Sequence, residues 1–217
     1  ERDVPALAPR LSPARLRVLL TMLTHVHGGL LNVSQLAGSL GVSSPTVIHQ
    51  LDLLEGAFMV RRLPPYFANL GKRLTKSPKV YLRDTGILHF LAGLRRPTDL
   101  STWPGRGASF EGLVIEEIAQ LASRRVVRPE LYFWRTQAGA EVDLLVKDGR
   151  RLVPIEVKLG ATVEGRSLAG LRQCMKDLGL RTGWVIYGGG QRRSVGRGIT
   201  LVPWTSVTSG EEDFGLG

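Results

Sequence analysis

The first sixty residues carry apolar side chains at helical spacing in three short runs, each opened by a residue that can cap a helix. The first run begins at Ser12-Pro13, and the third begins at Ser43-Ser44-Pro45 and continues to about Glu55. A turn at Gly41-Val42 separates the second helix from the third. Two helices joined by a short glycine-containing turn are typical of a helix-turn-helix motif.

A β-rich stretch follows the three helices. It covers 58–63, is interrupted by Pro64-Pro65, and has a candidate partner strand at 79–82. We interpret the pair as the wing of a winged helix-turn-helix domain that spans 1–96. The polar, proline-bearing segment 97–106 is expected to be a linker.

The remaining residues, 107–217, change to an α/β pattern. An amphipathic helix is expected at 108–125, with Glu117 inside its apolar face, Glu111 at the margin and Glu116 on the far side. Three strands are expected after this helix, at 131–136, 141–146 and 152–158. The expected fold class is α/β (α+β): a winged helix-turn-helix followed by a mixed sheet flanked by helices.

Composition is that of an ordinary globular protein. Of 217 residues, 43% are hydrophobic and 22% charged, and the single cysteine, Cys174, excludes an internal disulfide framework. Glu1-Arg-Asp-Val-Pro5 lacks signal-peptide character, and no apolar stretch is long enough for a membrane span. We therefore expect a cytoplasmic protein with no membrane partner.

The positive charge is concentrated in the first half. The net charge is +10, and residues 1–110 hold 14 basic and 6 acidic side chains against 15 and 13 afterwards. Seven basic residues and no acid lie from Arg61 to Arg83. Such a stripe favours a polyanionic partner, and DNA is the expected one. The predicted contact residues are Thr46, His49, Gln50, Arg61, Arg62, Lys72, Arg73, Lys76 and Lys79.

Two features weaken a base-reading role for the third helix. Asp52 and Glu55 lie on it and would repel phosphate, and no arginine occurs between Arg17 and Arg61. Contact of the wing with the DNA backbone is the favoured interpretation. A protein-docking role for the winged helix is the alternative, and a solvated basic surface without a partner is a further one.

Candidate chemistry lies in the second half. Glu156 and Lys158 share one face of the third strand because side chains alternate along a strand, and Asp143 lies on the neighbouring strand. With Glu111, these residues would gather three carboxylates and one lysine at one sheet edge. Mg²⁺ prefers oxygen ligands, so Asp143, Glu156 and Glu111 are the candidate metal ligands. Lys158 would activate water and offset transition-state charge in phosphodiester hydrolysis.

This pattern resembles a known superfamily. Gly107-x-x-x-Glu111, Asp143 and Glu156-Val-Lys158 are similar to the core of the PD-(D/E)XK nucleases. Some members carry a Gln-x-x-x-Tyr motif on the next helix, but here Gln173 is followed by Asp177 at that spacing.

The whole chain also resembles the C-terminal half of a family of prokaryotic AAA-type ATP-binding proteins. The residues that carry this likeness include Asn69-Leu-Gly-Lys-Arg73, Lys76-Ser-Pro-Lys-Val-Tyr81 and Gly139-Ala-Glu-Val-Asp143. The resemblance implies a partner ATPase domain of the same full-length protein and an assembly that includes homo-oligomers. The chain has no G-x-x-x-x-G-K-[ST] pattern, so ATP would bind in a domain outside it.

Two functions remain open at this point. One is a Mg²⁺-dependent DNA nuclease module, with Glu111, Asp143, Glu156 and Lys158 as catalytic residues. The other is a non-catalytic DNA-binding or oligomerisation scaffold, in which Glu156 and Lys158 simply pair with each other or with Arg135.

Overall fold

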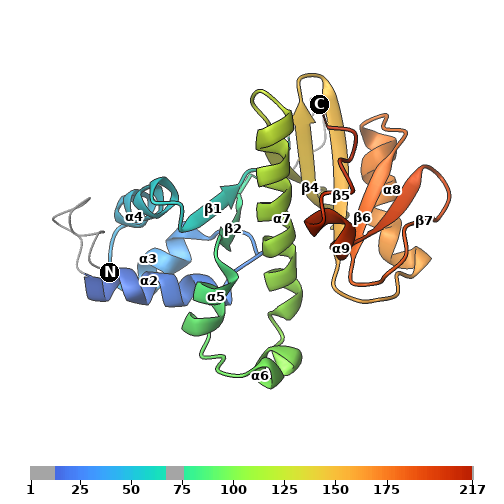
Figure 1. Cartoon of the computed structure of the whole chain (residues 1–217). Coiled ribbons are helices and arrows are strands. Elements are labelled where there is room, and N and C mark those ends of the chain that lie inside the picture. Colours follow the sequence, from blue (N-terminus) through green and yellow to red (C-terminus); the bar gives the residue numbers. More distant parts are fainter. Residues whose placement is uncertain (1–12, 67–75, 217) are drawn as a thin grey trace. The chain divides into compact units, whose positions relative to one another are not determined.

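The computed structural model describes residues 13–66 and 76–216, and these form two compact units (Figure 1). The first unit holds the described residues up to Arg62 together with Ser77–Gly112. The second holds the described part of Leu63–Lys76 together with Leu113–Gly217. The division therefore falls inside a helix, and one segment of the second unit comes from the middle of the first half of the chain.

The first unit has the element order expected of a winged helix. Its described helices and strands are α2 (Pro13–His25), α3 (Val33–Leu40), α4 (Ser44–Gly56), β1 (Val60–Leu63), β2 (Lys79–Leu82), α5 (Thr85–Leu91) and α6 (Pro97–Thr102). The predicted caps are present: Asn32 accepts the N–H of Gln35, and Ser43 accepts that of Thr46. Gly41 ends α3 in the left-handed conformation, at φ 63°. The helix-turn-helix prediction is confirmed for these elements.

The segment expected to be a linker, 97–106, contains helix α6. Pro97 stands at the start of that helix, and Asp99 accepts the backbone N–H groups of Arg95 and Arg96. A proline at the first helical position stabilises a helix start, so the same residue that suggested a linker begins an element of the first unit.

Helix α4 presents a different face than expected. Val47, Leu51 and Leu54 are buried, and Gln50 lies within the stripe that they define, so it is buried as well. Ile48 falls outside the stripe and is 43% exposed. Gln50 was expected on the surface as a DNA contact, and this assignment is corrected.

The second unit is built on a six-stranded mixed sheet. Its order is β3-β4-β5-β6-β8-β7, antiparallel from β3 to β5, parallel from β5 to β8, and antiparallel again at β7. The elements are α7 (Arg106–Arg125), β3 (Glu130–Arg135), β4 (Glu141–Asp148), β5 (Arg151–Lys158), the 3₁₀ turn η1 (Gly165–Leu168), α8 (Ala169–Asp177), β6 (Gly183–Tyr187), β7 (Arg193–Ser194), β8 (Ile199–Pro203) and α9 (Trp204–Thr208). The predicted mixed sheet with flanking helices is confirmed.

Helix α8 covers one face of this sheet. Its Leu171, Cys174 and Met175 pack with Trp134, Val185 and other strand residues in one buried cluster. Figure 1 shows the later turns of α7 on the opposite side of the strands. Glu156 is on the α8 side of β5, because Ile155 and Val157, its neighbours along the strand, lie outside that cluster.

The burial of Glu116 and Glu117, two neighbouring acidic residues of α7, is the reverse of the expectation. Glu116 is 8% exposed, whereas Glu117 is only half-buried. One apolar stripe had been assumed for the whole helix. The first turns of α7 belong to the first unit and its later turns to the second, so the buried face is not continuous along it.

Residues 64–66, which follow β1, are hydrogen-bonded to β3. Tyr66 N–H donates to Phe133 O at 2.7 Å, and Phe133 N–H donates to Pro64 O at 3.0 Å. Residues 64–66 therefore run parallel to β3 at the edge of the large sheet.

Candidate functional site

Asp143 is located where the ladder between β4 and its neighbours becomes irregular. The pairing with β3 shifts between Tyr132 and Trp134, so that Asp143 and Leu144 together oppose a single residue. Regular pairing with β5 begins only at Leu144. At this point a side chain replaces a backbone carbonyl as the hydrogen-bond acceptor: Asp143 Oδ2 accepts the Val157 N–H at 2.8 Å. The bulge thereby places Asp143 against the backbone between Glu156 and Lys158.

Glu156 and Lys158 share one face of β5, as predicted. Their side chains form an ion pair with Nζ and Oε1 2.6 Å apart. Glu156 is buried, while a third of the Lys158 side chain is exposed. The lysine therefore connects a buried carboxylate to the surface, and the structure contains the direct pairing that the sequence had left as the structural alternative.

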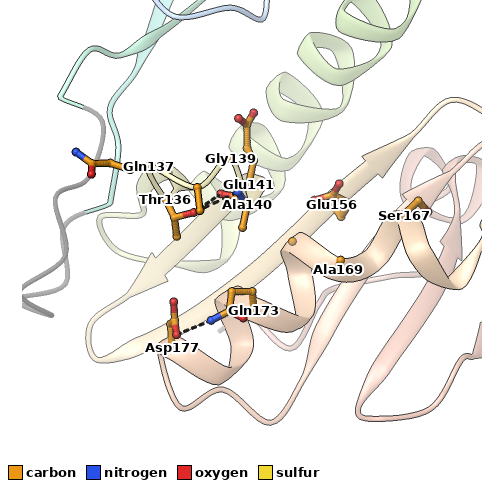
Figure 2. A pocket seen from close by; sticks show the side chains of 12 residues that line it. Thr136, Gln137, Gly139, Ala140, Glu141, Glu156, Ser167, Ala169, Gln173 and Asp177 are labelled. Atoms are coloured by element: carbon orange, nitrogen blue, oxygen red, sulfur yellow. Dashed lines mark hydrogen bonds between the residues drawn. The ribbon is translucent and has the colours of Figure 1, made fainter.

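A cleft of about 850 Å³ opens beside Glu156 (Figure 2). Three parts of the second unit line it: the turn 136–141, Glu156 on β5, and the segment from Ser167 to Asp177. Its lining residues also include Asp177 and Glu141, whose carboxylate lies 3.1 Å from Arg135 Nη1, so we call it the acidic cleft. Gln173 Nε2 donates to Asp177 Oδ1 at 2.8 Å, a bond drawn in Figure 2.

Two local features shape the acidic cleft. The turn between β3 and β4 is closed by Thr136 Oγ1, which accepts the Ala140 N–H at 3.1 Å, and by Gly139 at φ 88°. On the other side, a Cβ at Gly170 would lie 2.3 Å from Glu141 O. Only glycine allows α8 to approach β4 this closely.

The hydrogen bonds of Glu111 that the structure describes lie within the first unit, so its place in the predicted site stays a prediction. Its Oε1 accepts from Lys79 Nζ at 2.9 Å and from the Tyr81 hydroxyl, both within the first unit. Lys79 is 3% exposed and Tyr81 1% exposed, so the carboxylate serves as the partner of two buried polar groups. Helix α7 begins in the first unit, and Glu111, in its second turn, contacts the buried residues of that unit.

Arg62 changes the electrostatics of helix α4. Its guanidinium lies 2.7 Å from Asp52 Oδ1 and also pairs with Glu55, whose Oε1 accepts the Arg62 backbone N–H. The two acids that would repel phosphate are therefore compensated by an arginine from β1. The same contact occupies Arg62, which the sequence had assigned to DNA.

The other predicted DNA contacts divide into three groups. Gln50 and Lys79 are buried, which removes them from the surface. Lys72 and Arg73 lie outside the described residues. The exposed or half-buried ones are Thr46, His49, Arg61 and Lys76.

Within the described part of the chain, no group of three or more His, Cys, Asp or Glu side chains has the geometry to hold a metal ion. His27 has a structural role instead: burial lowers its pKa to about 4, and its ring bonds two backbone groups, Leu82 N–H at Nδ1 and Ala108 O at Nε2.

Glu141 and Asp177 line the acidic cleft, although neither was predicted from the sequence as a site residue. Only the sheet and α8 bring them together, since 36 positions separate them along the chain. One local signal existed: Asp177 follows Gln173 by one helical turn, the spacing at which side chains on a helix meet.

The fold and these side chains define a class: a chain with a helix-turn-helix unit and an α/β unit that carries an Asp…Glu-x-Lys cluster. Residues 1–98 match a family described as a domain of unknown function (DUF8612). Residues 106–207 match a second family with the same description (DUF4143).

Two curated relatives are similar along nearly the whole chain. They are the uncharacterized proteins Mb2031c of Mycobacterium bovis and Rv2008c of Mycobacterium tuberculosis. Each is 40% identical over 215 residues, which is 98% of this chain and 47% of the relative. The chain thus spans about half the length of the curated relatives it matches.

One solved structure is similar over part of the chain. It is the transcriptional regulator PA3341, at 22% identity and a TM-score of 0.26, covering 57% of this chain and 90% of that one. A likeness this weak carries no argument about function. Of the helices in residues 13–66 and 76–216, none has the length and apolar character to span a membrane.

Proposed function

We propose that this chain is the DNA-binding, nuclease-like module of a longer ATP-dependent protein, and that Asp143, Glu156 and Lys158 act on DNA phosphodiesters. One observation carries the proposal: Asp143 is bonded to the backbone N–H between Glu156 and Lys158, beside the acidic cleft. Two carboxylates and an ammonium at one strand end are the side-chain set that the PD-(D/E)XK pattern requires.

Two of the three predicted carboxylates are enough to hold a magnesium ion. Mg²⁺ takes one or two protein carboxylates, keeps several waters and completes its shell with substrate phosphate. Asp143 and Glu156 would hold it, without Glu111. When bound, the ion supplies charge neutralisation at the phosphate and an activated water.

Lys158 contributes through its charge. Its side chain is one-third exposed and its ammonium pairs with Glu156, so it can exchange that carboxylate for a phosphate oxygen when DNA enters. A positive group held at the reacting phosphate stabilises the charge that develops in the transition state more than the charge of the ground state.

DNA as the substrate is supported by the first unit. Thr46 and His49 are exposed near the N-terminal end of α4, the end that enters the major groove in helix-turn-helix proteins. Arg62 compensates the acids of that helix, and Arg61 adds positive charge. Because α4 presents few groups for base recognition, binding to the backbone is the expected mode.

The proposal of an ATP-binding domain outside this chain rests on the resemblance to AAA-type proteins and on the greater length of the curated relatives. The curated relatives are about twice as long as this chain, which leaves room for another domain. In the AAA-type proteins that the chain resembles, that domain binds ATP. We propose the same arrangement here, with oligomers formed through the ATPase.

A non-catalytic scaffold is the second candidate function. The direct Glu156–Lys158 pair favours it, because a carboxylate already neutralised by lysine binds a cation less strongly. The ion pair of Glu111 with Lys79 favours it as well, because a carboxylate that a buried lysine neutralises binds a cation less strongly.

Calorimetric titration with Mn²⁺ or Mg²⁺ separates the two candidates. We expect the wild-type protein to bind one ion and Asp143→Asn to bind it at least about tenfold more weakly, because asparagine keeps the acceptor for Val157 N–H but loses the charge. Asp148→Asn, at the far end of the same strand, is the matched control and should bind as the wild type does. Absence of metal binding by the wild type would establish the scaffold instead.

A further inference from the structure

A second hollow of about 480 Å³ is lined mainly by residues of α8. Two residues, Ala169 and Gln173, line both this hollow and the acidic cleft, so the two are neighbours on one helix. Its other lining residues are Arg172, Met175, Lys176, Leu180 and Arg197. Three of its residues are basic, and none of the described residues that line it is acidic. We call it the basic hollow.

We infer that the basic hollow is a phosphate-binding subsite for nucleic acid, which leads the sugar-phosphate backbone of a DNA strand towards the acidic cleft. The inference rests on the proposed function, since it assigns a path to the same substrate. It adds a contact surface in the second unit, whereas the basic stripe of the sequence lies before residue 84.

The arginine on the helix is positioned before any ligand arrives. Arg172 Nη1 donates to Gly165 O at 2.7 Å, which fixes the guanidinium beside η1. Its Nε is buried and has no hydrogen-bond partner among the described residues. A buried donor without an acceptor is costly, and a phosphate oxygen in the hollow is the kind of acceptor that would remove this cost.

The arginine of the neighbouring turn is held in an unusual conformation. Gly196, Arg197 and Gly198 follow one another with φ values of 80°, 53° and 74°. A non-glycine residue in the left-handed region is disfavoured and persists only where its surroundings enforce it. Such residues are concentrated at functional sites, which is consistent with a ligand contact by Arg197.

The surroundings of that turn are tight. A Cβ at Gly198 would lie 2.0 Å from Arg181 O, and Gly183 N–H donates to Gly198 O at 3.0 Å. Ile199 N–H closes the turn on Gly196 O at 3.1 Å. The loop is therefore pinned to the end of the sheet, and Arg197 is kept next to α8 rather than moving freely.

The charges also match a strand of phosphates better than a single free anion. Arg172 and Lys176 are one turn apart on α8, and Arg197 comes from a separate loop. Lys176 and Arg197 are exposed, so a long polyanion can reach them. Three cations on an open surface suit consecutive phosphates, because each neutralised phosphate releases bound counterions.

Fluorescence anisotropy of labelled oligonucleotides, in a series of KCl concentrations with EDTA present, tests the inference. Both a 15-nucleotide single strand and a duplex of the same length are measured, and EDTA keeps metal binding and cleavage out of the result. The test variant is Lys176→Gln with Arg197→Gln, because both residues are exposed and glutamine does not threaten the fold. Arg172→Gln is measured separately.

The matched control is Arg128→Gln with Arg150→Gln, two exposed arginines elsewhere in the second unit. We expect the test variant to bind at least one of the two oligonucleotides about tenfold more weakly than the control. For the single strand, the slope of log K against log salt should fall by about 0.7 for each lost phosphate contact.

Two results would overturn the inference. The first is equal affinity of the test and control variants for both oligonucleotides. The second is a test variant that loses binding of inorganic phosphate but keeps its affinity for DNA, since the hollow would then take a free anion. Neither result depends on the Mn²⁺ titration, so the basic hollow can fail while the metal site stands, and the reverse.

Discussion

At the scale of single residues, buried polar groups show how far chemistry can be inferred from spacing. Asp143, Glu156 and Lys158 are brought together because they lie on adjacent strands at positions that a hairpin register determines. Glu111 lies on a helix, and nothing in its spacing says which unit that part of the helix packs against. Its partners, Lys79 and Tyr81, are about thirty positions away in the chain.

His27 gives a prediction about pH. Leu82 N–H donates to its Nδ1, so the ring is neutral with its proton on Nε2, facing Ala108 O. The folded pKa is about 4 against 6.5 for the free side chain. The unfolded chain takes up the proton first as the pH falls. Stability should therefore be lost between pH 6.5 and 4, by up to about 3 kcal/mol.

Urea unfolding at several pH values measures this effect. The His27→Gln variant should show a shallower decline between pH 6.5 and 4 than the wild type, whatever its stability at neutral pH. His25→Gln, an exposed neighbour on α2, should keep the wild-type slope. Equal slopes for wild type and His27→Gln would show that the ring is not held neutral.

At the scale of elements, the position of helices and strands could be predicted better than the faces they bury. Caps, glycine turns and strand alternation placed α2 to α4 and β3 to β5 close to their observed bounds. The buried face of α4 and that of α7 were misassigned, because Gln50 and Glu116 are buried for reasons of tertiary packing. The short strand β7 and helix α9 have too little periodicity to be predicted.

The contact between α8 and β4 gives a prediction about packing. A Cβ at Gly170 would meet Glu141 O at 2.3 Å, and backbone cannot move aside cheaply. We expect Gly170→Ala to lower the free energy of unfolding by about 1–3 kcal/mol, despite the higher helix propensity of alanine. Urea unfolding, with the variant and the wild type measured side by side, gives the difference.

Gly38→Ala provides the control in helix α3. No atom lies within 4 Å of a Cβ at that position, so the propensity gain should appear alone, as a stabilisation of about 0.5–1 kcal/mol. If Gly170→Ala stabilises the protein to the same extent, α8 is not packed against β4 as closely as described.

At the scale of the whole molecule, the division into units differs from the division along the sequence. The first family match ends at residue 98 and the second begins at residue 106, so the boundary between them coincides with the expected linker, 97–106. The compact units instead divide within α7, and residues 64–66 run beside β3 of the large sheet. Contacts that are distant along the chain decide this division, and a pattern of local signals contains no information about them.

The central claim is that Asp143, Glu156 and Lys158 form a site that hydrolyses DNA. It is tested most directly by cleavage of single-stranded, duplex and branched DNA with Mg²⁺ or Mn²⁺, by the chain and by the longer protein that contains it. The variants are Glu156→Gln, which keeps the volume and removes the charge, and Lys158→Ala, which removes the ammonium. Thermal unfolding of each variant shows whether a loss of activity is a loss of fold.

We predict that the wild type cleaves DNA and that either substitution lowers turnover by about 100-fold or more, while DNA binding is retained. The loss should appear in kcat rather than in affinity, because both groups act mainly in the transition state. Cleavage by Glu156→Gln at the wild-type rate would contradict the account. So would a wild type, tested also in its longer form, that cleaves none of these DNAs with either metal.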